Sequence, residues 1–214
     1  MMLSVDKIVA KFPIKILPII TGKPDYESIN HMVQTLYSNA ASLATPLSSK
    51  AHGHIGIIMR QALYSTLTAT PYTSPPYPGE LPYIPLAATA PIWEVIRLQH
   101  TEERHVYDNH VNMDDALKSQ VINAIHKTYI CEMRNKYTGY LGVTTRDLLD
   151  HLLDWYGKIT PANIETCKCR MIEPINSTQP IKLFFNVSMT ACSMPMMGKW
   201  LSLPNKIFRQ RITQ

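Results

Sequence analysis

Among the residues of this chain, the histidines are the best candidates for metal ligands. His52 and His54 are separated by one residue, and no third ligand follows at a suitable spacing. His100 and His105 lie five residues apart, about 140° around a helix, and lack the i, i+4 placement of metal-binding helices. The sequence therefore predicts no metal site, and we expect His100 and His105 on a solvent-exposed helix face.

Cysteine, serine and acidic residues likewise match no catalytic or zinc-binding pattern. Cys167 and Cys169 are too close for a zinc knuckle, which needs C-x-x-C and a later histidine, and no histidine follows His151. Asp150, His151 and Asp154 could transfer protons, but no G-x-S-x-G elbow presents a serine nucleophile. No phosphate-binding loop or dinucleotide fingerprint is present. We expect a protein that is not an enzyme, with no cofactor and no small-molecule substrate.

Composition indicates a globular protein of a reducing compartment. The 214 residues are 45% hydrophobic and 17% charged, which is enough apolar content for a core and too little charge for wholesale disorder. No apolar run reaches the length of about 18 residues that a membrane-spanning helix needs. Four cysteines in a chain of this length are not typical of a secreted disulfide framework. We expect a cytoplasmic protein with no membrane partner.

The excess positive charge lies near the end of the chain. Residues 175–214 contain five basic residues and no acid, so the 16 remaining basic residues equal the 16 acids, and the net charge of +5 belongs to this segment. We expect residues 189–214 to be a disordered basic tail. Its candidate contacts to RNA, which would be weak and sensitive to salt, are Lys199, Trp200, Lys206, Arg209 and Arg211.

Hydrophobic periodicity predicts helices on both sides of a proline-rich linker. Residues 1–68 are expected to form an N-terminal extension. In it an extended arm, broken by Pro13 and Pro18, precedes one strong helix capped by Asp25. Residues 69–91 contain seven prolines and should be a semi-rigid linker.

Residues 92–188 are expected to form a domain of consecutive helices joined by short loops. Pro91 should open the first of these helices, and Asn112 should cap the next. Short loops imply antiparallel neighbours, so the predicted fold class is all-α, an antiparallel helical bundle with an extended arm and a linker. The inner stripe expected on the first helix consists of Ile92, Val95, Ile96, His100, Glu103 and Val106.

Residues 144–174 show the strongest pattern, that of two helices joined by a tight turn. Thr144 and Asp147 fit a capping box, and Gly157 stands where a helix ends in a left-handed residue. Thr160 and Pro161 restart the chain as a second helix. The residues expected to form the core or a self-association seam are Leu148, Leu149, Leu152, Leu153, Trp155, Tyr156 and Met171.

This stretch resembles the Gag polyprotein of copia-type LTR retrotransposons, in the form found in diatom and oomycete elements. The matching residues are Tyr156-Gly157, Ile159-Thr160, Arg170-Met171, Pro174 and Pro180-Ile181. Residues 22–29 and 52–59 resemble the same group, so the likeness spans roughly residues 12–185. The resemblance implies a retroelement capsid-type bundle over residues 92–188, and a structural protein whose copies associate and package element RNA.

The resemblance ends before the basic tail. Family members should continue into further capsid helices after Phe185, whereas residues 189–214 lack helical periodicity, which indicates a degenerate or frame-shifted copy. The alternative interpretation is a helical adaptor that docks through its proline-rich segment, where Pro75 and Pro78 form a P-x-x-P pattern.

Overall fold

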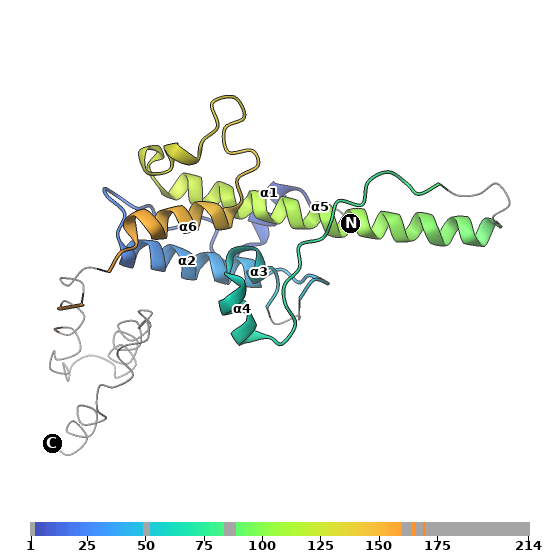
Figure 1. Cartoon of the computed structure of the whole chain (residues 1–214), viewed down its shortest axis with the longest axis horizontal. Coiled ribbons are helices and arrows are strands. Elements are labelled where there is room, and N and C mark those ends of the chain that lie inside the picture. Colours follow the sequence, from blue (N-terminus) through green and yellow to red (C-terminus); the bar gives the residue numbers. More distant parts are fainter. Residues whose placement is uncertain (1–2, 49–51, 84–88, 160–163, 166–168, 170–214) are drawn as a thin grey trace, which may run out of the picture. The chain divides into compact units, whose positions relative to one another are not determined.

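Helices form the regular structure of the computed structural model, which describes residues 3–48, 52–83, 89–159, 164–165 and 169. Two short 3₁₀ turns, Lys127–Tyr129 and Cys131–Met133, follow the longest helix, and the described residues contain no β-strand (Figure 1). The predicted all-α fold class is confirmed. The α-helices are α1 (Val5–Lys11), α2 (Tyr26–Ala41), α3 (Ile55–Ile58), α4 (Gln61–Leu67), α5 (Ala90–Ala124) and α6 (Thr145–Tyr156).

The chain divides into two units, Met1–Lys158 and Ile159–Gln214, and nearly all described residues belong to the first. In that unit α1, α2 and α6 pack against α5, and α3 packs against both α2 and α6. Residues 1–68, expected to be an extension, thus contribute helices to the same core as α5. Apart from residues 164–165 and 169, the predicted second helix of the hairpin lies outside the described residues, as does the basic tail, and so do Met171, Lys199, Trp200, Lys206, Arg209 and Arg211.

Helix α2 begins at the predicted cap. Asp25 accepts a hydrogen bond from the Ser28 backbone N–H at 2.9 Å, and Ser28 Oγ accepts one from the Asp25 N–H at 3.0 Å. At the C-terminal end of the helix a later segment of the chain packs on the last turn: Gly53 has a φ of +48°, and the His54 N–H donates to Ala40 O at 2.8 Å. Along its length the helix buries the apolar side chains of Ile29, Met32, Val33, Leu36 and Ala40.

Helix α5 is one helix of 35 residues where the sequence analysis predicts two. Residues 92–124 contain no glycine or proline, so nothing interrupts the helix after Pro91. Asn112 lies inside α5, and its side-chain amide donates to Leu3 O at 2.9 Å. The predicted break was wrong because Asn112 makes a long-range contact to the start of the chain, not a local cap.

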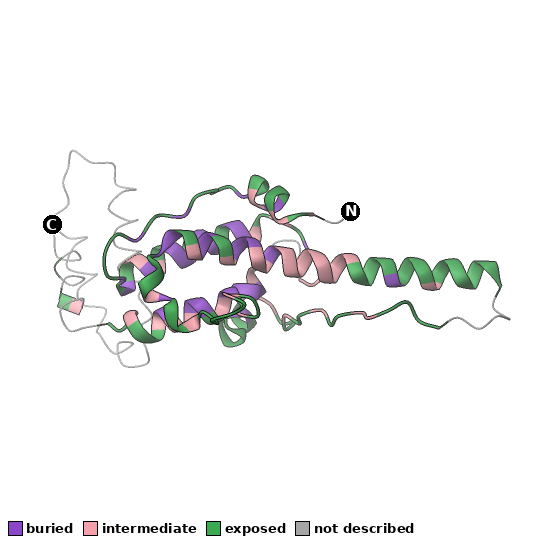
Figure 2. Cartoon of the chain, turned by 90° about the horizontal axis from the view of Figure 1, so that it is seen from above, coloured by how far each residue is buried: buried purple, intermediate pink, exposed green. Residues whose placement is uncertain are grey.

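The first half of α5 is largely exposed, contrary to the predicted inner stripe. Ile92, Val95 and Glu103 are exposed, and of the six residues expected on that stripe only His100 is buried. Figure 2 shows exposure giving way to burial along the helix. The reason is that the packing helices cover only the second half, where the buried residues include Met113, Ala116, Leu117 and Val121 (Figures 1 and 2).

Two buried side-chain amides hold the N-terminal arm, in a contact that we call the arm clamp. Asn39 Nδ2 donates to Ile14 O at 2.7 Å, and Asn39 Oδ1 accepts from the Ile14 N–H at 3.1 Å. Gln120 Nε2 donates to Lys15 O at 2.9 Å, while Gln120 Oε1 accepts from Asn39 at 2.9 Å. The arm is therefore extended without being a strand, and it buries Phe12, Leu17 and Ile20.

An Asn39→Ala substitution is expected to lower the free energy of unfolding by about 2–3 kcal/mol, because polar groups of Ile14 and Gln120 lose their partners. Urea denaturation followed by circular dichroism measures the change. The matched control is Asn123→Ala, whose side chain is exposed and should alter stability by less than about 0.5 kcal/mol. Equal effects of the two substitutions would contradict the arm clamp.

Candidate functional site

Helix α6 carries most of the residues predicted to form a core or self-association seam. It begins at the predicted capping box, in which Thr144 Oγ1 accepts from the Asp147 N–H at 3.1 Å and Asp147 Oδ2 accepts from the Thr144 N–H at 3.0 Å. Thr145 then ties the helix to α5, because its N–H and hydroxyl donate to Asp114 at 3.0 and 2.9 Å. In this position α6 buries Leu148, Leu149 and Leu152 in the core of the chain.

The remaining described seam residues differ in how far they are covered. Leu153 and Tyr156 are partly buried against the core. Trp155, in the last turn, is 63% exposed, and the His151 ring lies beside it, with centroids 6.2 Å apart. Gly157 ends the helix with φ of −81°, so the predicted left-handed conformation was wrong, although a Cβ there would meet Leu153 O at 2.6 Å. The leucines thus belong to the core, and Trp155 belongs to the surface.

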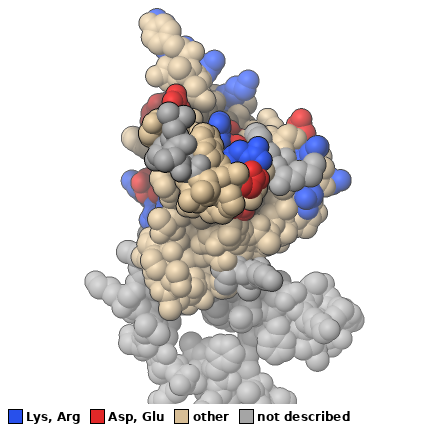
Figure 3. All heavy atoms as spheres, turned by 90° about the vertical axis from the view of Figure 1, so that its right-hand side faces the viewer, with Lys and Arg blue, Asp and Glu red and all other residues tan. Residues whose placement is uncertain are grey.

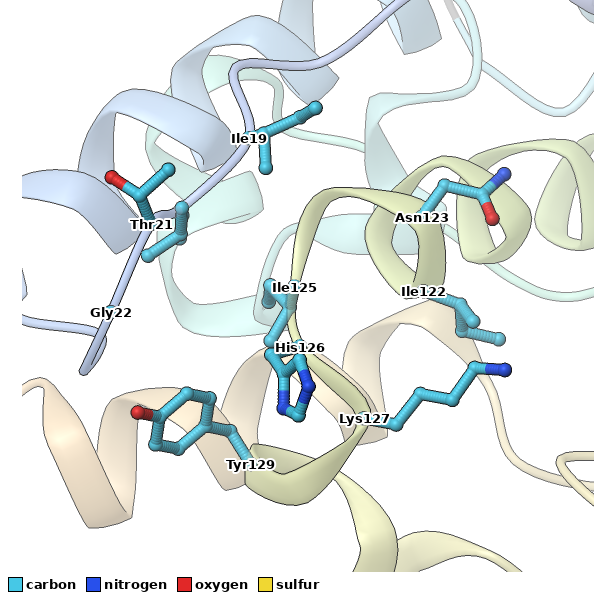
Figure 4. Close-up of a pocket in the computed structure, with 10 residues that line it drawn as sticks. Ile19, Thr21, Gly22, Ile122, Asn123, Ile125, His126, Lys127 and Tyr129 are labelled. Atoms are coloured by element: carbon cyan, nitrogen blue, oxygen red, sulfur yellow. The ribbon is translucent and has the colours of Figure 1, made fainter.

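An open groove of about 720 Å³ lies beside the arm at the C-terminal end of α5 (Figure 4), and we call it the arm groove. The Ile20 N–H donates to Ala124 O at 2.8 Å and holds the arm along this end of the helix. None of the described residues that line the groove is acidic. No sequence pattern indicates the groove, because its two sides are far apart in the chain: Ile19 on one, and Ile122, Ile125, His126, Lys127 and Tyr129 on the other.

The exposed first half of α5, residues 90–106, is a second surface, which we call the spur. Its apolar side chains lie open to solvent: Val95 is 63% exposed and Leu98 is 57% exposed. Ile92 and Trp93 are exposed as well. The sequence pattern identified a helix with an apolar side here, but it contained no sign that this side would lack a cover.

The proline-rich linker is fixed to the body through Tyr72. The Tyr72 ring packs edge-to-face on Tyr64, with centroids 5.7 Å apart, and its hydroxyl shares a hydrogen bond of 3.0 Å with His110 Nδ1. A Cβ placed on Gly56 would overlap the Tyr72 ring. The ring can therefore occupy this position, which we call the seat of Tyr72, only because residue 56 has no side chain. No local sequence rule connects Gly56 with Tyr72.

Two of the histidines considered as metal ligands, His54 and His100, are buried in the structure. His100, which the sequence placed both on the inner stripe of the helix and in an exposed histidine-rich face, is buried, and its Nε2 hydrogen-bonds to Gly79 O at 3.2 Å. His54 is also buried, and its Nδ1 has no partner within the described structure. Burial lowers the pKa of His54 to about 4, and it also lowers the pKa of His110. In the described part of the chain no three His, Cys, Asp or Glu side chains are grouped so as to hold a metal.

Charged side chains form pairs within the body. Arg60 Nη2 lies 2.6 Å from Asp150 Oδ1, and Lys118 Nζ lies 2.7 Å from Asp115 Oδ1. On the face shown in Figure 3 acidic and basic side chains are interspersed, and most of the surface is uncharged. This face therefore offers no continuous basic field of the kind that binds nucleic acid.

No protein-family model, curated protein or solved structure matches the chain. Among the helices that the structure describes, none combines the length and apolar character needed to cross a membrane. Function must therefore be inferred from the arm groove, the spur and the outer side of α6, together with the resembling stretches of sequence.

A Gly56→Ala substitution is expected to displace Tyr72 and to lower the free energy of unfolding by about 1–3 kcal/mol, because the new methyl group overlaps the ring. Protease cleavage within residues 69–83 should become faster, which mass spectrometry can follow. Adding Tyr72→Ala removes the clash, so the double variant should lose less stability than the sum of the two single variants. Strict additivity would contradict the seat.

The buried His54 should make stability depend on pH. Because its pKa is about 4 in the folded chain and about 6.5 when unfolded, the unfolded state binds the extra proton, and the free energy of unfolding should fall by about 3 kcal/mol from pH 6.5 to pH 4. Urea midpoints at several pH values measure this. A His54→Leu variant should show a shallower dependence of the free energy of unfolding on pH, and an unchanged dependence would contradict the role of His54.

Proposed function

We propose that the chain is a structural polypeptide of the retroelement Gag type, whose copies associate through apolar helix surfaces and catalyse no reaction. Three stretches in the order found in that family support the proposal. The helical fold of the described residues and the large apolar side chains on their surface also favour it. In this proposal the assembly forms in the cytoplasm and packages element RNA, with weak contacts from the basic tail.

The spur is the observation that carries the proposal. Eighteen residues make about five turns of an α-helix, so Val95 lies on the same side of α5 as Met113, and Leu98 on the same side as Ala116. Met113 and Ala116 are completely buried. The apolar side that builds the core therefore continues into solvent along the spur, and contiguous exposed apolar surface is typical of a protein–protein contact.

Helix-to-helix association would cover this side as α1, α2 and α6 cover the second half. Fully burying one large aliphatic side chain contributes about 1.5–3 kcal/mol, so several such residues can offset the cost of joining two chains. Gln99 and Glu102 interrupt the apolar side, which favours a reversible contact over an obligate one.

The adaptor remains a second candidate because the linker presents aromatic and proline side chains outward. Tyr83 is 85% exposed, and Pro76 and Tyr77 are also exposed. Tyr77 nevertheless packs edge-to-face on Tyr107 of α5, with centroids 5.3 Å apart. A partner domain that binds the linker would have to do so while the opposite side of the linker stays packed on α5, or would have to displace the linker from α5.

Self-association is tested by size-exclusion chromatography with light scattering over a range of concentrations. The full chain should form oligomers, and Leu98→Asp should shift it towards the monomer, because a carboxylate cannot be buried without a partner. Thr101→Asp is the matched control, since Thr101 is an exposed, polar position of the spur that is not part of its apolar side. A chain that stays monomeric at every concentration would contradict the proposal and would leave the adaptor as the better interpretation.

A further inference from the structure

Trp155 is the largest side chain that α6 leaves uncovered. It is 63% exposed, although every other residue of the predicted seam within the described structure is buried or partly buried. The preceding residue, Asp154, is also exposed, and its carboxylate lies no closer than 3.9 Å to Arg60 Nη2. The outer side of α6 thus presents an indole ring next to a weakly paired negative charge. Tryptophan is among the residues most often found as the anchor of a protein–protein contact.

The arm groove has complementary properties. Its walls include the apolar side chains of Ile19, Ile122 and Ile125, and Tyr129 adds an aromatic ring (Figure 4). With about 720 Å³ of open space it has room for an indole. Lys127 supplies a positive charge, and no acid among the described lining residues neutralises it.

The groove and the last turn of α6 are neighbours within one chain. Tyr129, which lines the groove, packs edge-to-face on Tyr156, with centroids 5.4 Å apart. Trp155 lies about 100° around the helix from Tyr156. It is not among the residues that line the groove of its own chain. Because anchor and groove lie close together, two copies related by a two-fold axis can each place the anchor in the groove of the other.

We infer that Trp155 of one copy occupies the arm groove of a second copy, in a reciprocal dimer in which Asp154 faces Lys127 of the other chain. The inference rests on the proposed function, since it assigns a second surface, besides the spur, to the proposed self-association. Apolar walls match the indole, and the two opposite charges fix its orientation. A single-stranded RNA is the weaker occupant, because tight binding to RNA needs several phosphate contacts and the groove offers one lysine.

The test measures the dimer dissociation constant of the full chain by sedimentation equilibrium. Trp155→Ala and Ile19→Asp should each weaken the dimer by more than about tenfold. Ile16→Asp is the matched control, because Ile16 is 80% exposed on the same arm but does not line the groove. Circular dichroism checks that all variants keep their helix content.

A charge exchange tests the orientation. Asp154→Lys and Lys127→Asp should each weaken the dimer, because each places like charges opposite one another. The double variant restores opposite charges in both halves of a reciprocal dimer, so its dissociation constant should return to within about threefold of the original. A double variant weaker than both single variants would overturn the inferred pairing.

The outcomes separate this inference from the proposed function. If the full chain associates but neither Trp155→Ala nor Ile19→Asp weakens it, the inference is overturned and the proposed function stands. If the full chain is monomeric, the proposed function itself is overturned. Fluorescence anisotropy with a labelled oligouridylate covers the remaining case: weaker RNA binding by Ile19→Asp, with an unchanged dimer, would assign the groove to RNA and overturn the inference.

Discussion

The arm clamp is the constraint on which the remaining structure depends. An extended arm has no sheet partner, so its backbone N–H and C=O groups can enter a core only if side chains bond them. Asn39 and Gln120 provide these bonds from α2 and α5, and they also bond each other. The same arrangement fixes the distance between the two helices and brings Ile19 and Ile20 to the end of α5. The arm groove exists because the clamp holds the arm there.

Helix α5 connects the core with the surfaces proposed to bind other copies. No glycine or proline breaks it, so one apolar side runs from the buried second half into the spur. Its C-terminal end forms one side of the groove, and its middle receives Thr145 of α6 through Asp114. One rigid element therefore sets the positions of the core, the spur and the groove at the same time.

Local rules predicted the helix starts well and the tertiary roles poorly. Asp25 and Thr144 cap their helices as expected, because a capping box involves residues only three positions apart. Asn112 was misread, since its partner Leu3 lies at the start of the chain. The stripe beginning at Ile92 was placed on a helix correctly, but periodicity gives the apolar side and not its cover. Periodicity likewise could not show that Trp155 would be uncovered. No local sequence pattern indicated the arm groove.

The seat of Tyr72 has a consequence for how related chains can diverge. Residue 56 must lack a side chain only while an aromatic ring occupies the space above it. The two positions should therefore co-vary: lineages that keep tyrosine at 72 keep glycine at 56, and lineages that lose the ring are free to gain a methyl group. A correlated pair of this kind, far apart in sequence, would record the attachment of the linker over evolutionary time.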